Sequence, residues 1–131
     1  MFWGWNMDSH QAIEQLLGYV YQVRYALYFL LVQEDERSQI SVEKFDDIAI
    51  SHNEKVDTLV QLKHHVKQSG NLTDASTDFW RTLKVWIDAI KQEENVLDTT
   101  RFLIITTATA PKDTAAYHLK NDTDKRNVEM A

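Results

Sequence analysis

Three polar residues on two short extended segments have types and a spacing that suit phosphodiester chemistry. Asp47 precedes Gln61 by fourteen positions, and Lys63 follows two positions later. Side chains alternate along a strand, so Gln61 and Lys63 share one face while Val60 and Leu62 take the other. Paired strands lie about 5 Å apart, so a hairpin would set the carboxylate opposite an amide oxygen and an ammonium.

Such a set would hydrolyse a phosphodiester with the help of a hard divalent cation. Mg²⁺, or Mn²⁺ in its place, takes oxygen ligands. The candidate ligands are the Asp47 carboxylate, the Gln61 side-chain carbonyl and the backbone carbonyl of Leu62. Lys63 would hold the attacking water and offset charge growing on the phosphate. A Q-x-K triplet alone occurs by chance in many proteins, so its weight depends on the elements that carry it.

The first half of the chain predicts a long helix followed by three strands. Apolar residues recur at helical spacing from Ser9, a candidate N-cap, to about Gln33. They occupy more than one face, so we expect this helix to be covered on more than one side. Three extended segments follow, at residues 40–45, 47–50 and 58–62. The last two flank the polar stretch 52–55 and together predict a hairpin.

The second half predicts a helix and a further strand. Ser76 or Thr77 can cap a helix with an apolar stripe formed by Phe79, Leu83, Trp86, Ile87 and Ile90. The β-branched and aromatic run 101–107 is typical of a strand buried on both faces. Short helices are expected at 114–120 and from about residue 124. The order helix, three strands, helix, strand indicates the α/β class.

Composition limits the functions that the chain can have. Its 131 residues suit one domain, and the absence of cysteine excludes disulfides and a thiolate metal site and fits a reducing cytoplasm. No apolar run reaches the ~18 residues of a membrane span. The net charge of −6 argues against a simple nucleic-acid binder.

No Ser-His-Asp arrangement is evident, and His52 is expected to be a solvated loop residue. The one local basic cluster, a candidate DNA-contacting set, comprises Lys55, Lys63, His64, His65 and Lys67.

The ordered series of motifs resembles the PD-(D/E)xK nucleases, in their D…QxK variant. It is similar to the nuclease domain of bacterial antiphage effectors associated with CD-NTase signalling and of Lamassu-type defence systems. The residues that carry the resemblance are Gly18–Gln22, Val42–Glu43 with Asp46–Ile48, Val60–His64, Asp78–Leu83 with Trp86, and Phe102–Thr107.

The resemblance implies a restriction-endonuclease-like αβββαβ core, with a mixed central sheet flanked by helices. It implies a single nuclease domain over residues 1–131, with its core at 9–107, as a fragment or the N-terminal domain of a longer effector. The expected activity is Mg²⁺-dependent cleavage of double-stranded DNA in antiphage defence, in a cytoplasmic homo-oligomer or with partner defence subunits. The alternative is a catalytically silent module that keeps the nuclease fold for DNA binding or assembly.

The same resemblance assigns the metal-binding acid to Asp47 and the Q-x-K to Gln61 and Lys63. Asp46 is the alternative acid at this position, or supports the ligands from behind. Glu43 is a further candidate ligand or supporting acid. Gln22 either points at the site or is a buried, hydrogen-bonded amide.

Overall fold

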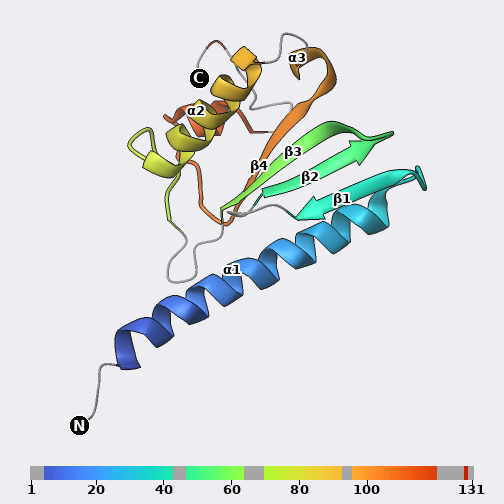
Figure 1. The fold of residues 1–131 in the computed structure, drawn as a ribbon. Helices are drawn as coiled ribbons and strands as arrows, with labels where there is room; N and C mark the ends of the chain where they lie inside the picture. The colour runs from blue at the N-terminus through green and yellow to red at the C-terminus, as the bar shows by residue number, and fades with distance from the viewer. Residues whose placement is uncertain (1–4, 43–46, 64–69, 93–95, 121–128, 130–131) are drawn as a thin grey trace.

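A four-stranded mixed sheet with helices on both faces forms the centre of the molecule (Figure 1). The structure, a computed structural model, describes residues 5–42, 47–63, 70–92, 96–120 and 129. The elements in chain order are α1 (Trp5–Val32), β1 (Ser38–Val42), β2 (Asp47–His52), β3 (Lys55–Lys63), α2 (Thr77–Gln92), α3 (Val96–Thr99), β4 (Arg101–Thr106) and α4 (Ala115–His118). The predicted succession of helix, three strands, helix and strand is present, and α4 confirms the short helix expected at 114–120, whereas the short α3 was not predicted.

The strands lie side by side in chain order, β1-β2-β3-β4. β1 and β2 are antiparallel, as are β2 and β3, whereas β3 and β4 run parallel. Antiparallel strands can be joined by tight turns, but a parallel pair needs a long crossover connection. The segment that contains α2 and α3 supplies that crossover. The α/β class and the mixed sheet expected from the sequence are therefore confirmed.

A two-residue turn joins β2 to β3. Asn53 and Glu54 both have positive φ, at 50° and 65°, as a type I′ hairpin turn requires. Its flanking residues, His52 and Lys55, are paired across the two strands. The predicted hairpin is confirmed, with a connection shorter than the polar stretch 52–55 because its outer residues belong to the strands.

Apolar side chains pack on both faces of the sheet. On one face α1 contributes Ala26 to a cluster with Ile48, Val60 and Leu62. On the other face Phe79 of α2 packs with Leu72 and with apolar residues near α4. Because residues 60 and 62 are buried under α1, the alternating positions 61 and 63 take the α2 face, as the strand pattern predicts.

Four local expectations need correction. The first helix begins at Trp5, so Ser9 lies within it rather than at its cap. β4 is half-buried instead of covered on both faces, because it is an edge strand of the described sheet. Ile87 of the predicted α2 stripe is exposed. Finally, the described residues cover α1 on the sheet side alone, where Tyr25, Ala26 and Phe29 pack, whereas residues of its main apolar pattern such as Leu16 and Leu27 are exposed.

Two other points bear on the expectations from the sequence. Parts of the strand predicted at 40–45 and the helix predicted from residue 124 lie outside the described residues. None of the described helices has the length and apolar character needed to cross a membrane.

Candidate functional site

The three residues singled out for their chemistry meet on the α2 face at one end of the sheet. Asp47 and Gln61 are direct partners in the β2–β3 ladder. Directly opposite residues of antiparallel strands project from the same face with Cβ atoms about 5 Å apart. Lys63 lies two positions further along β3 and therefore on that same face. All three side chains are half-buried.

β4 fixes the backbone at the Lys63 end of this cluster. Gln61 is paired with Ile104 and Lys63 with Thr106 in the parallel ladder. Beyond the strand, the Thr107 N–H donates to the Lys63 carbonyl at 3.3 Å. The Thr106 hydroxyl accepts from the N–H of Ala108 at 3.0 Å, which turns the chain away from the sheet. The strand that carries Gln61 and Lys63 is thus held on both sides.

Gln22 supports the cluster from the opposite face of the sheet. Its side chain is 4% exposed, and its Nε2 donates to the backbone carbonyl of Asp47 at 2.8 Å. Of the two alternatives that the sequence left open, Gln22 is a buried amide, and its partner is the main chain of the candidate acid. This contact joins α1 to the first residue of β2.

The oxygen donors at the cluster fit a hard divalent cation. Asp47 offers a carboxylate and Gln61 an amide carbonyl, which are ligand types that Mg²⁺ accepts. Leu62 can contribute only its backbone carbonyl, because its side chain is a hydrocarbon, and that side chain is buried on the α1 face. Within the described ranges, no three or more His, Asp or Glu side chains are grouped so that they could hold a metal ion by themselves. Glu43 and Asp46, the further candidate acids, lie outside those ranges.

Of the basic cluster expected at the hairpin, the structure describes Lys55 and Lys63. Lys63 belongs to the site, whereas His64, His65 and Lys67 lie outside the described residues. Lys55 begins β3 beside the turn, eight positions from Lys63. At ~3.3 Å per residue the two ammonium-bearing positions are roughly 26 Å apart along the strand. The structure therefore does not bring Lys55 together with Lys63.

A Ser-His-Asp set that the sequence did not reveal lies at the other end of the sheet. Ser38 Oγ is 2.6 Å from His52 Nε2, and His52 Nδ1 contacts the Asp57 carboxylate. Ser38 and His52 are partners across β1 and β2. Asp57 is the extra residue of a bulge, because Ile50 pairs with Thr58 while Ser51 pairs with Val56. The expectation of a solvated His52 is therefore wrong, and only knowledge of the strand register and the bulge would have corrected it.

This set connects β1, β2 and β3, and the backbone N–H groups beside it already donate hydrogen bonds within the protein. Nucleophilic catalysis by a serine needs N–H groups directed at the developing oxyanion. The Ser38 N–H donates instead to the Asp35 carbonyl at 3.0 Å. The neighbouring Arg37 N–H donates to the Asp35 carboxylate at 2.9 Å. We therefore assign the Ser38–His52–Asp57 set a structural role.

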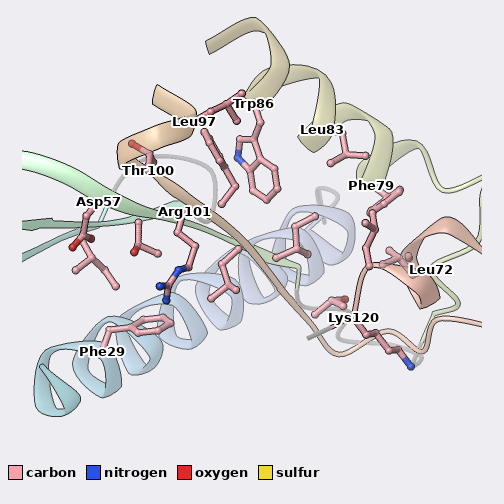
Figure 2. Close-up of a pocket in the computed structure, with 18 of the residues that line it drawn as sticks. Phe29, Asp57, Leu72, Phe79, Leu83, Trp86, Leu97, Thr100, Arg101 and Lys120 are labelled. Atoms are coloured by element: carbon pink, nitrogen blue, oxygen red, sulfur yellow. The ribbon is translucent and has the colours of Figure 1, made fainter. Parts of the chain in front are cut away.

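A large open hollow of about 1380 Å³ runs along β4 (Figure 2). Phe79, Leu83 and Trp86 of α2 line it on one side, and Phe29 of α1 contributes on the other. Asp47, Gln61 and Lys63 are not among its lining residues. The hollow follows from incomplete cover of an edge strand, and we base the candidate site on the polar cluster because that is where the donor groups converge.

Comparisons with protein-family models, with curated proteins and with solved structures find no match. The class of the protein therefore rests on its own fold and geometry. These define a mixed α/β domain with an acid, an amide and a lysine gathered at one end of the sheet.

Proposed function

We propose that this chain is a metal-dependent DNA endonuclease domain of the restriction-endonuclease-like class, acting as an effector in bacterial antiphage defence. One observation carries the proposal. Asp47 lies directly opposite Gln61 on the neighbouring strand, and Lys63 follows on the same face. An acid, an amide oxygen and an ammonium thus converge from two strands that share a tight hairpin.

The architecture supports the proposal. An αβββαβ core with a mixed sheet is what the resemblance to the PD-(D/E)xK nucleases implies, and α1, the three-strand meander, α2 and parallel β4 follow that order. The candidate acid opens β2, and the Q-x-K lies at the end of β3. Both are therefore at the same end of the sheet.

Each residue has a definable part in the proposed reaction. A bound Mg²⁺ would polarise the phosphate and favour ionisation of a water. Asp47, Gln61 and the Leu62 carbonyl would hold that ion, and the Gln22 hydrogen bond would fix the main chain of Asp47. The Lys63 ammonium would orient the attacking water and offset charge that develops on the phosphate oxygens.

A plasmid-cleavage assay with Mg²⁺ or Mn²⁺ tests the assignment. We expect Asp47→Ala and Lys63→Ala to lower the nicking rate by roughly 10²-fold or more, as loss of a key electrostatic group does. Lys112→Ala is the matched control, because it removes the same charge at an exposed lysine that belongs to neither the candidate site nor the expected basic cluster. Wild-type nicking by either site variant, with circular dichroism unchanged, would contradict the assignment.

Metal binding can be tested without any cleavage. A cation that binds only the folded chain stabilises it by about 2.7 kcal/mol at a concentration 100 times its dissociation constant. We expect Mg²⁺ to raise the melting temperature of the wild type and to have no such effect on Asp47→Asn. An equal rise of the melting temperature in Asp47→Asn would show that the metal binds to another acid.

A catalytically silent module is the second candidate, and the net charge of −6 favours it. Phosphate contacts provide most non-specific affinity for DNA, so an acidic chain binds it weakly. The two assays above separate the candidates. A silent module gives neither nicking nor a metal-dependent rise in stability, whereas the endonuclease gives both.

A further inference from the structure

α1 exposes a continuous row of aliphatic side chains on the side away from the sheet. Each is between 41% and 60% exposed, so none is covered by the described part of the chain. The row, here called the α1 stripe, comprises Ile13, Leu16, Val20, Val23, Leu27 and Leu30. Figure 1 shows that the N-terminal half of α1 also extends past the edge of the sheet. A helix that is apolar on most of its circumference is normally covered on every side.

The spacing of the α1 stripe is that of a coiled coil. Successive members are three, four, three, four and three residues apart, which is the a/d pattern of a heptad repeat. Of the buried residues of α1, Gln22 lies about 160° around the helix from Val20, whereas Ala26 lies only about 40° from Leu30. The α1 stripe is therefore well separated from the sheet-facing side near Val20 and borders that side near Leu30.

The charge on α1 permits a second copy of the same helix to approach. α1 as a whole carries Asp8, Glu14 and Arg24, but the span of the α1 stripe, residues 13–30, carries only Glu14 and Arg24, whose formal charges sum to zero. The whole chain carries −6. Two copies thus meet without net repulsion along the α1 stripe, whereas the acidic remainder of the surface disfavours self-association.

We propose that two copies of this chain pair through the α1 stripe as a two-stranded coiled coil. A two-fold axis brings the same face of both helices together, so that residues of one α1 stripe contact residues of the other in layers. In an antiparallel pair residue 13 would meet 30, residue 16 would meet 27, and residue 20 would meet 23, while a parallel pair would set each residue against itself. The partner that this register fits is therefore the chain itself.

The exposed area is sufficient for a specific interface. Leu17 and Leu31 flank the α1 stripe and are 40% and 74% exposed. If each of these eight aliphatic side chains exposes on the order of 100 Å², they present roughly 800 Å² together, the area that one partner contributes to a standard interface. The inference does not depend on the proposed nuclease function, because the mass of the particle is measured without substrate.

Sedimentation equilibrium of the wild type, and of a variant with a charge introduced into the α1 stripe, tests the proposal. We expect the wild type to have twice the monomer mass and Leu27→Glu to weaken self-association roughly 30-fold or more, as truncation of a central contact does. Val85→Glu is the matched control, because Val85 is also an exposed aliphatic residue, 59% exposed, but on α2. Near-ultraviolet circular dichroism checks that each variant keeps its fold.

A wild type that stays monomeric at tens of micromolar overturns the proposal, as does a Leu27→Glu variant that associates like the wild type. Cysteine cross-linking gives a second readout, because the chain has no cysteine of its own. A disulfide between two Val20→Cys chains supports a parallel pair, and one between Val20→Cys and Val23→Cys chains supports an antiparallel pair. No cross-link in either experiment contradicts the pairing.

Discussion

The hydrogen bond from Gln22 to the Asp47 carbonyl offers a sharp test of how α1 positions the candidate site. Gln22→Leu keeps the approximate volume of the side chain and removes the donor. The Asp47 carbonyl then loses a partner 2.8 Å away in a place where Gln22 itself is 4% exposed. Removal of one partner of a buried hydrogen bond costs about 1–3 kcal/mol, partly offset here by the apolar replacement.

We therefore expect Gln22→Leu to lower the free energy of unfolding by about 1–2 kcal/mol. For a domain of this size that corresponds to a melting temperature lower by roughly 5 °C. The assay is urea unfolding followed by circular dichroism, in which the midpoint falls while the slope stays constant. If the proposed function is correct, the Mg²⁺-induced stabilisation falls as well, since the main chain of Asp47 is held less firmly.

Gln15→Leu is the control, because Gln15 lies on the same helix but is exposed. Its effect should remain within about 0.5 kcal/mol, as for most surface changes. Equal unfolding midpoints for Gln22→Leu and the wild type would refute the reasoning that this bond holds the start of β2.

Three further predictions concern stability at other places. Glu54→Gly should raise the free energy of unfolding by up to about 1 kcal/mol, because Glu54 has a φ of 65° that glycine adopts without the clash of a Cβ atom. A lower urea midpoint than that of the wild type would contradict this. Burial, followed by a hydrogen bond with Tyr25, raises the pKa of Tyr21 to about 12 from 10.0. The folded state thus favours the neutral phenol, so the contribution of Tyr21 to the free energy of unfolding is fully present below pH 10 and declines between pH 10 and 12. When urea midpoints are compared over that range, the decline should be smaller in Tyr21→Phe. Asp57→Ala should cost at most about 1 kcal/mol, because its ion pair with His52 is partly solvated; a loss of several kcal/mol in urea unfolding would show a larger role.

The sequence predicted the elements of the fold where periodicity and turn residues agree. The alternation of Val60 and Leu62 with Gln61 and Lys63 predicted the two faces of β3, because one face must be buried. The hairpin was predicted for a similar reason, since a polar stretch separates two apolar runs. The direct pairing of Asp47 with Gln61, in contrast, depends on the bulge at Asp57, because the register at the turn, where His52 pairs with Lys55, would otherwise set Asp47 opposite Val60.

Other features depend on contacts that no local pattern encodes. The bulge at Asp57 shifts the register by one residue, and this shift, rather than any motif, brings Asp57 to His52. The run 101–107 was predicted to be buried on both faces from composition alone, but cover depends on how many strands and helices surround it. The partner of Gln22 is 25 residues away, so its identity required the three-dimensional structure.

The two proposals together predict the course of DNA cleavage. The candidate site faces α2, and the α1 stripe lies beyond the other face of the sheet. A pair joined through α1 therefore holds its two sites on outer faces. With about 10 Å between packed layers, two sheets separated by two helices place the sites roughly 30 Å apart. The major groove is only about 12 Å wide, so the two sites cannot reach facing strands at one position.

Such a pair should nick the two strands independently. We expect a supercoiled plasmid to accumulate as nicked circles before linear DNA appears, with the same ratio of nicked to linear product for the wild type and for Leu27→Glu. Pairing should still increase the nicking rate at low salt, because a second bound site raises the local concentration of the first. Linear product formed without a nicked intermediate would mean that the two sites face the same duplex, and the α1 pairing could not then be the arrangement that cuts DNA.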